Sequence, residues 1–171
     1  NSFRVLGSKW GSFVMLVGVT KGIIATSLYI LIPFYLNNEL ARTNFMIALG
    51  MVAVLGHIFP IFANFRGGKG VATLLGMALA IQPMVALLCL VVFLITLLST
   101  RFVSLSSILA GVAFMVLILF IFKEKETIYR LFAIIVAMMV VVSHQKNISR
   151  LMKGTENKVP IFKNRDRRNL K

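Results

Sequence analysis

Residues 56–73 read GHIFPIFANFRGGKGVAT, and the second half of this stretch packs three glycines and two cations into residues 66–70. Apolar runs lie on both sides, so the cluster marks the end of a membrane span. Glycine lets a ligand approach backbone N–H groups closely, and Arg66 and Lys69 stand beside those groups. Val71 then reads as the start of a helix, whose N-terminus is partially positive. The stretch predicts a phosphate-binding loop at a membrane surface; the alternative is a tight interfacial turn whose cations only set the topology.

This loop differs from the phosphate loop of nucleotide-binding enzymes, which reads G-x-x-x-x-G-K-[ST]. Aligned on Gly68 and Lys69, that motif requires glycine at Ala63 and serine or threonine at Gly70, and the sequence has neither. A P-loop nucleotidase is therefore excluded.

The composition is that of an integral membrane protein. Of the 171 residues, 58% are hydrophobic, and the mean hydropathy is +0.90, which is too apolar for a soluble domain of this size. The net charge of +14 could suggest nucleic acid as a partner, but the cations stand in short segments between apolar runs, and nine follow His144. That placement fits the positive-inside rule and attraction to anionic headgroups. We therefore expect membrane lipids, and no nucleic acid, as partners.

The apolar runs predict an all-α, polytopic bundle with six crossings. The expected spans are 12–36, 44–59, 71–81, 83–99, 104–122 and 128–142. The residues 71–99 are divided at Gln82-Pro83 because a single crossing there would put the glycine loop and the cation-rich end on opposite faces, against the positive-inside rule. The helix 71–81 would then be about 16 Å long, half the thickness of the hydrocarbon core, which is tolerable if its neighbours bury its end.

Lys21-Gly22 interrupts the first predicted span about a third of the way in. An ionisable group at that depth is costly and is a functional candidate by default. A long lysine stem can also reach the interface by snorkelling, so both interpretations stay open.

Two further polar clusters follow later spans. Arg101 and Ser104 would share a face if helical and could offer a guanidinium and a hydroxyl to an oxyanion; the alternative is a capped helix start with one topogenic arginine. His144 and Asn147 are spaced to point the same way from a helix, although a basic helix lying on anionic lipid is an alternative. Gly154-Thr-Glu156 is expected to be a helix stop and loop brace. The lone Cys89 lies in an apolar run, so neither a disulfide within the chain nor a cysteine metal cluster is expected.

Three stretches, in order, resemble the signatures of the bacterial acyl-phosphate:glycerol-3-phosphate acyltransferases, the PlsY family. Asn1-x-x-Arg4 is similar to the end of the first signature, residues 56–73 to the second, and His144-x-x-Asn-x-x-Arg followed by Gly-Thr-Glu to the third. The Gly-Ser-rich part of the first signature, its serine and the membrane helix before it have no counterpart here. We therefore expect an N-terminally truncated chain, with a seventh crossing in the whole protein.

The resemblance implies a reaction. An acyl phosphate would donate its acyl group to the 1-hydroxyl of glycerol 3-phosphate, giving lysophosphatidic acid and phosphate for phospholipid biosynthesis, with no cofactor and no metal. The acyl phosphate is already activated, so positioning and electrostatic stabilisation would suffice. The expected catalytic residues are Lys69, His144 and Asn147, and the expected substrate-binding residues are Asn1, Arg4, Lys21, Arg66, Gly67, Gly68, Gly70, Arg101 and Ser104. The base is either the donor's own phosphate oxygen or His144.

The remaining expectations concern place and partners. Residues 1–158 are expected to form one membrane domain and 159–171 a basic cytoplasmic tail, with the active site on the cytoplasmic face of a bacterial inner membrane. The resemblance also implies a soluble partner, the enzyme that makes acyl phosphate. A small anion transporter or channel with a basic vestibule is the alternative function, but it does not explain why the polar groups gather on one face.

Overall fold

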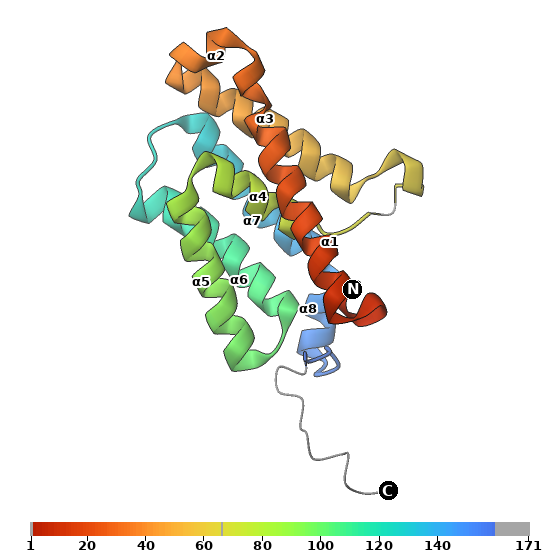
Figure 1. Ribbon diagram of the computed structural model, residues 1–171. Coiled ribbons are helices and arrows are strands. Elements are labelled where there is room, and N and C mark those ends of the chain that lie inside the picture. The colour runs from red at the N-terminus through yellow and green to blue at the C-terminus, as the bar shows by residue number, and fades with distance from the viewer. Residues whose placement is uncertain (1, 66, 160–171) are drawn as a thin grey trace, which may run out of the picture.

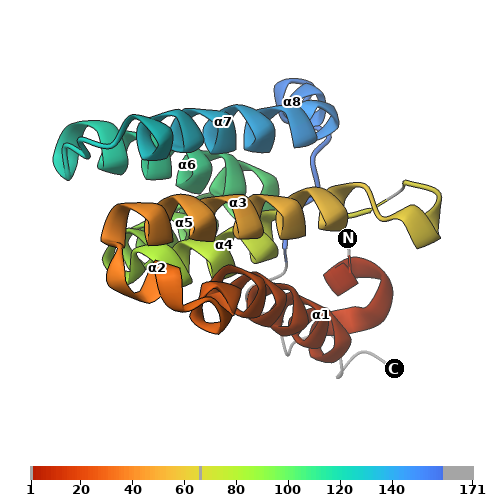
Figure 2. The ribbon, with the colours of Figure 1, turned by 90° about the horizontal axis from the view of Figure 1, so that it is seen from above.

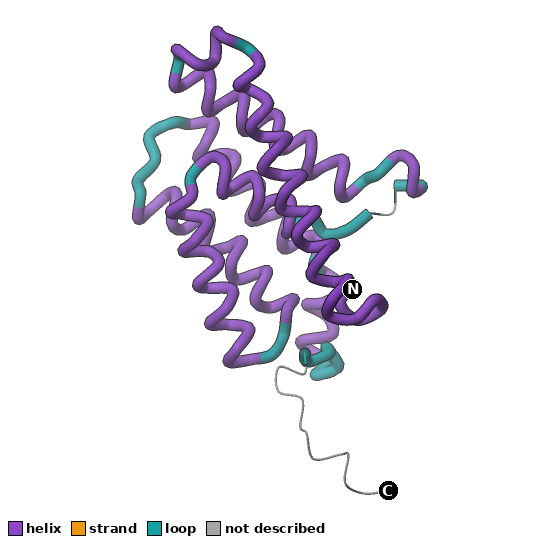
Figure 3. Tube along the Cα trace, viewed as in Figure 1, coloured by secondary structure: helices purple, strands orange, loops and turns teal. Residues whose placement is uncertain are grey.

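The computed structural model describes residues 2–65 and 67–159, and every regular element in those ranges is a helix (Figures 1 and 3). The predicted all-α class is therefore confirmed. In chain order the α-helices are α1 (Ser2–Ser27), α2 (Pro33–Asn37), α3 (Glu39–Ile58), α4 (Val71–Ile81), α5 (Pro83–Thr100), α6 (Val103–Val116), α7 (Thr127–Ser143) and α8 (Gln145–Met152). Two short 3-10 helices, η1 (Leu28–Leu31) and η2 (Ile61–Ala63), lie between them, and a π-helical stretch, η3 (Leu117–Ile121), continues α6.

Four stretches of helix in the described chain are long and apolar enough to cross a membrane. They are Lys9–Leu31, Glu39–Ala63, Pro83–Thr100 and Val103–Ile121. A fifth crossing results if α7 and α8, which are bent by 59° at their junction, count as one span. The apolar helix α4 is shorter than a span, as predicted. The total of six crossings stays a prediction.

The first span differs from the predicted 12–36. Helix α1 begins earlier, contains a break at Gly7 (φ 78°, ψ 176°) and already ends at Ser27. The turn η1 and then Pro33, at the first position of α2, separate α1 from α3, because proline lacks the N–H that a continuing helix needs.

The short helix α4 lies inside the bundle and contacts α1, α3 and α5. Viewed from above, α1 and α7 lie at opposite edges of the molecule, with α4 and α5 between them (Figure 2). Glycines allow α1 and α4 to approach closely: a Cβ on Gly22 would overlap the carbonyl oxygen of Thr73, and one on Gly76 would overlap that of Val19. Small residues are the usual means of close helix contact in membranes.

The far end of α4 is held by a hydrogen bond to α7. The Tyr129 hydroxyl donates to the Gln82 side-chain oxygen at 2.9 Å, directly at the turn between α4 and α5. Tyr129 is buried, and its ring packs beside Phe132, which meets Phe114 edge-on. Neighbouring helices thus partly bury the end of α4 and give Gln82 a hydrogen-bond partner. A helix can stop within a membrane bundle when its neighbours cover its end in this way.

The polar clusters gather at one end of the bundle. The N-terminal part of α1, the turn between α5 and α6, and α8 lie at that end, while α2 and the turn before α7 lie at the other (Figure 1). The predicted tail 159–171 lies, apart from Val159, outside the described residues. The N–H of Val159 donates to the Arg101 carbonyl at 2.9 Å, so the chain after α8 runs back along the turn between α5 and α6.

Candidate active site

The glycine loop between α3 and α4 is folded against the end of α3. The N–H of Gly67 donates to the Ile58 carbonyl at 3.1 Å, and that of Gly68 donates to the His57 carbonyl at 3.2 Å. A Cβ on Gly67 would overlap the His57 carbonyl oxygen, and one on Gly68 would overlap the His57 imidazole. Both positions therefore require glycine for close approach. Their N–H groups shape the loop and do not form the anion nest that the sequence predicted.

Gly70 turns the loop into α4. It is the N-terminal cap of α4 with φ 78° and ψ −6°, a left-handed conformation that favours glycine. The Leu74 N–H donates to the Gly70 carbonyl at 2.8 Å, and the N–H groups of 69–73 have no acceptor among the described residues. The first N–H groups of a helix lack intrahelical partners and bind anions readily. This helix start is therefore the part of the loop that can receive a phosphate.

Lys69 links the glycine loop to α8. Its Nζ lies 2.6 Å from the Asn147 Oδ1 atom, and the Asn147 Nδ2 atom donates to the Glu156 carboxylate at 2.7 Å. Because an ammonium only donates and a carboxylate only accepts, these two partners fix the orientation of the amide. In this expected catalytic residue, the Nδ2 group is thus taken by Glu156, and the oxygen faces Lys69.

Glu156 joins three segments of the chain. Its Oε1 atom accepts from the Ser104 hydroxyl at 2.7 Å as well as from Asn147, and its Oε2 atom accepts from Arg150 Nε at 2.7 Å. Burial opposes the charge of this carboxylate, but the hydrogen bonds from Asn147, Arg150 and Ser104 together outweigh it and lower its pKa to about 2. The expected role of Glu156 as a brace is thus confirmed by its contacts. Gly154 (φ 67°) follows the end of α8, as expected of a helix stop.

Burial governs the protonation of both Lys69 and His144. Burial lowers the pKa of Lys69; the carboxylate of Glu156 counteracts this effect, and the guanidinium of Arg150 adds to it. Burial also lowers the pKa of His144, and the neighbouring Lys69 lowers it further, against the raising effects of the Val140 carbonyl and Glu156. His144 is therefore neutral at pH 7, since its ordinary pKa is about 6.5.

The tautomer of His144 follows from its backbone contact. The Nδ1 atom lies 2.8 Å from the Val140 carbonyl oxygen, and a carbonyl only accepts, so Nδ1 carries the proton. The residue is 2% exposed. The Nε2 atom is left with its lone pair and can accept a proton or a hydrogen bond, which is the chemistry required of a general base or an orienting acceptor.

The other predicted residues lie around this centre or outside the described parts. Lys21 is exposed on α1 and within electrostatic reach of His57. Arg101 is exposed and has a left-handed backbone (φ 63°) that ends α5, whereas α6 begins only at Val103. Arg101 and Ser104 would share a face only if one helix contained both, and that condition is not met. Ser104 is buried and donates its hydroxyl to Glu156.

Asn1 and Arg66 lie outside the described residues, as does the side chain of Arg4, whose backbone belongs to α1.

Two features of the site have no obvious signal in the sequence. One is the contact between the His57 ring and Gly68. The only hint of it in the sequence is that both residues lie within the stretch 56–73. The other is the close contact of α1 with α4 at Gly22 and Gly76, for which glycines four residues apart on α1 are a weak signal.

The chemistry open to this centre is the binding of anions and the transfer of a proton. It combines an ammonium, a neutral imidazole, an amide and a helix start. Over the described residues, no group of three or more His, Cys, Asp or Glu residues is placed to hold a metal ion.

Comparison with known proteins gives the family. Residues 1–154 match the glycerol-3-phosphate acyltransferase family. Glycerol-3-phosphate acyltransferase 2 of Bacillus anthracis is 43% identical over 159 residues, which are 93% of this chain and 78% of that protein. Glycerol-3-phosphate acyltransferase of Fusobacterium nucleatum subsp. nucleatum is also 43% identical, over 92% of this chain and 77% of that protein.

Solved structures agree with these relatives. The crystal structure of PlsY, an integral membrane glycerol 3-phosphate acyltransferase, in its lysophosphatidic acid form has a TM-score of 0.78 and 33% identity, covering 91% of this chain and 76% of that one. The glycerol 3-phosphate form gives a TM-score of 0.76 and 34% identity, covering 92% and 74% of the two chains. None of these proteins supports the alternative of an anion transporter. The chain belongs to the PlsY family of glycerol-3-phosphate acyltransferases and is an integral membrane enzyme that transfers an acyl group to glycerol 3-phosphate.

Proposed function

We propose that the acyl donor is an acyl phosphate, and that the products are lysophosphatidic acid and inorganic phosphate. The observation that carries this proposal is the Lys69 ammonium, which Asn147 holds at 2.6 Å. Lys69 precedes the start of α4 by two residues, and the first N–H groups of that helix have no acceptor among the described residues. Cation and helix start together suit a phosphate group. An acyl donor with a phosphate leaving group would place the negative charge of that phosphate between Lys69 and the start of α4.

In the proposed reaction, the 1-hydroxyl oxygen of glycerol 3-phosphate attacks the carbonyl carbon of the acyl phosphate. The carbon–oxygen bond to phosphate then breaks, and the phosphate leaves with the electron pair of that bond. Lys69 and the N-terminus of α4 stabilise the charge that grows on the leaving phosphate. The leaving group is already good, so the enzyme needs no covalent intermediate.

The proton of the attacking hydroxyl requires an acceptor. The Nε2 atom of His144 is neutral and unprotonated, which suits it to this task. The donor's own phosphate oxygen is the alternative acceptor. Asn147 holds Lys69 in place, and its oxygen can also accept from a substrate hydroxyl.

The acceptor phosphate needs its own cations. Arg4, Lys21, Arg66 and Arg101 remain our candidates, with Asn1 beside them. Gly67, Gly68 and Gly70 would serve by shaping the loop, and Ser104 by holding Glu156. These roles rest on the resemblance to the family signatures and on the gathering of the polar clusters at one end of the bundle.

The site is further proposed to face the cytoplasm from a bacterial inner membrane. The excess of cations at this end is what the positive-inside rule expects of a cytoplasmic face. Residues 1–158 would form the membrane domain and 159–171 a basic tail. A soluble enzyme that makes acyl phosphate would then meet the membrane on the same side.

A donor comparison tests the proposal. Purified protein in detergent is given glycerol 3-phosphate with palmitoyl phosphate, palmitoyl coenzyme A or palmitoyl acyl carrier protein, and lysophosphatidic acid and phosphate are measured. We expect product with palmitoyl phosphate only, and phosphate release that depends on glycerol 3-phosphate. Equal turnover with a thioester would overturn the proposed donor without affecting the acyltransferase activity itself.

A further inference from the structure

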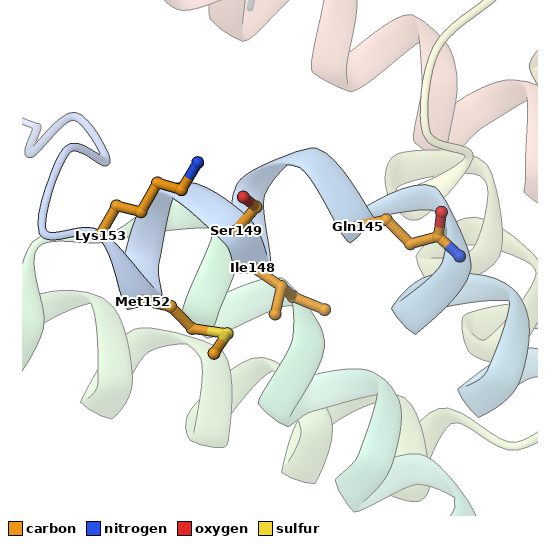
Figure 4. A pocket seen from close by; sticks show the side chains of 5 residues that line it. All are labelled: Gln145, Ile148, Ser149, Met152 and Lys153. Carbon is orange, nitrogen blue, oxygen red and sulfur yellow. The ribbon is translucent and has the colours of Figure 1, made fainter.

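Helix α8 presents two different faces. His144, just before the helix, and Asn147 within it point into the site and are buried. The opposite stripe consists of residues at helical spacing, and it lines a shallow, open hollow of about 480 Å³ (Figure 4). The lining residues are Gln145, Ile148, Ser149, Met152 and Lys153.

The hollow is apolar in its middle and polar at its ends. Met152 is 84% exposed, and Ile148 is half-buried beside it. Figure 4 shows Lys153 at one end and Gln145 at the other. The hollow is shallow and open to the outside, and exposed apolar side chains rimmed by polar ones mark an interaction site.

The charge around this face is strongly positive. Residues 143–159 contain four cations and a single acid, Glu156, and that acid is bonded to Arg150. Lys146 and Lys153 are exposed, and neither forms an ion pair with another described residue. The turn 123–126 at the other end of the bundle carries two cations and two acids and is neutral.

The direction of α8 suits a helix at a membrane surface. It is bent by 59° from α7, the apolar helix that precedes it. If α7 crosses the membrane, α8 leaves the direction of the span and inclines toward the surface. A helix with apolar and basic residues on an exposed face binds there through apolar burial and attraction to anionic lipid.

We propose that the outer face of α8 binds an anionic membrane lipid and that this lipid supports catalysis. Lys153 and Lys146 would contact the phosphate of the headgroup, and an acyl chain would lie over Ile148 and Met152. An anionic lipid explains why an apolar hollow stands beside cations. Its acyl chain suits the apolar hollow and its headgroup suits the lysines, and both parts of such a lipid are present at this end of a membrane bundle.

The opposite face of α8 provides the coupling to catalysis. Asn147 holds the Lys69 ammonium at 2.6 Å, so a change in the position of α8 changes the position of that cation. Small misplacements of a catalytic group are costly. A lipid that fixes α8 would therefore raise turnover.

Activity in neutral membranes with added anionic lipid tests the coupling. The full chain is reconstituted into phosphatidylcholine nanodiscs with increasing phosphatidylglycerol, and formation of lysophosphatidic acid is measured. We expect turnover to rise with phosphatidylglycerol. The double variant Lys146→Gln/Lys153→Gln should need roughly tenfold or more phosphatidylglycerol for the same rise, while the matched control Lys123→Gln/Lys125→Gln should behave as wild type. An equal shift in both double variants, or no rise in wild type, would overturn the proposal.

A binding measurement distinguishes a lipid site from a surface for a soluble protein. A bimane fluorophore is attached at Met152→Cys in a Cys89→Ala background, and quenching by brominated phosphatidylglycerol is compared with quenching by brominated phosphatidylcholine. Leu98→Cys, exposed on α5, is the control that both lipids should quench equally. Stronger quenching by phosphatidylglycerol at residue 152 alone supports the site. Equal quenching by both lipids at residue 152 would show that the face does not select an anionic lipid and would overturn the proposal. Absence of quenching by either lipid would also overturn it and would indicate that this face binds a soluble partner.

Discussion

The Nζ atom of Lys69 lies 2.6 Å from the Oδ1 atom of Asn147, although 78 residues separate them in the chain. This contact joins the glycine loop to the helix that follows the last apolar span. The carboxylate of Glu156 bonds the other end of the same amide. The position of the ammonium is therefore set by a carboxylate that does not touch it.

Replacing Lys69 by methionine keeps an unbranched side chain, one atom shorter, and removes its charge. We expect kcat/KM to fall by about 100-fold to 1,000-fold, because the leaving phosphate loses a charged donor in a partly buried site. Lys125→Met, in the exposed turn before α7, is the matched control and should retain wild-type rates. Normal turnover of Lys69→Met with palmitoyl phosphate would show that the loop does not bind the donor.

Replacing Glu156 by glutamine tests the brace. The new glutamine amide is uncharged and has only one acceptor oxygen, so it cannot accept hydrogen bonds from Arg150 and from the Asn147–Ser104 pair as the carboxylate does. We therefore expect a loss of about 2 kcal/mol in the free energy of unfolding. Glu39→Gln is the control, since its contact to Arg42 is 3.7 Å long and its side chain is 88% exposed. Such surface pairs contribute little. Equal effects of the two variants on unfolding in detergent would contradict the brace.

The same pair of variants gives a pH dependence. Because the pKa of Glu156 is lowered to about 2 from an ordinary 4.5, its contribution is complete above pH 4.5 and is lost as the pH falls toward 2. The difference in unfolding free energy between wild type and Glu156→Gln should therefore shrink over that interval. A difference that disappears already near pH 6 would mean that the carboxylate is not stabilised as described.

Replacing Gly22 by alanine tests the contact between α1 and α4. The added Cβ would overlap the Thr73 carbonyl oxygen and would lie 2.9 Å from the Met77 nitrogen and 3.1 Å from the Gly76 Cα atom. These are backbone atoms, so the helices must separate, and we expect a loss of about 1–3 kcal/mol in unfolding free energy. Gly56→Ala in α3 has open space around it and should be neutral or stabilising by up to about 1 kcal/mol. If both substitutions leave stability unchanged, the close packing of α1 on α4 is wrong.

Much of the fold follows from short-range patterns. The half-length helix α4 could be predicted because Gln82-Pro83 divides an apolar run and because the distribution of cations requires a turn there. The grouping of His144 with Asn147 was expected from a shared helix face; the two residues do lie close together, but His144 stands at the bend before α8 and only Asn147 belongs to that helix. Both arguments depend on periodicity and charge, which the sequence displays directly.

The partners across the bundle could not be predicted in this way. Spacing along the chain does not tell which helices meet, so the bond between Ser104 and Glu156, 52 residues apart, has no local signal. The shared face considered for Arg101 and Ser104 is absent for a related reason. Spacing indicates a shared face only within one helix, and the left-handed backbone of Arg101 ends α5 before α6 begins.

The pH dependence of turnover tests the role of His144. Its pKa is lowered by burial and by Lys69, and only the neutral ring can accept a proton. We therefore expect kcat/KM for acyl transfer to fall on the acidic side, with the midpoint of that fall below the ordinary histidine pKa of about 6.5. If His144 is the base, His144→Gln should lose about 100-fold to 10,000-fold in rate and should also lose the acidic limb of the profile.

Substrate phosphates titrate near pH 6 as well, so the variant separates the two sources of an acidic limb. An acidic limb that persists in His144→Gln belongs to the substrate, and a variant that keeps much of its activity makes His144 an orienting residue. Either result would assign the proton to the donor's phosphate oxygen. His57→Gln is the matched control, because His57 packs against the glycine loop without entering the Lys69–Asn147–Glu156 network. That variant should keep the acidic limb of wild type, whatever its rate.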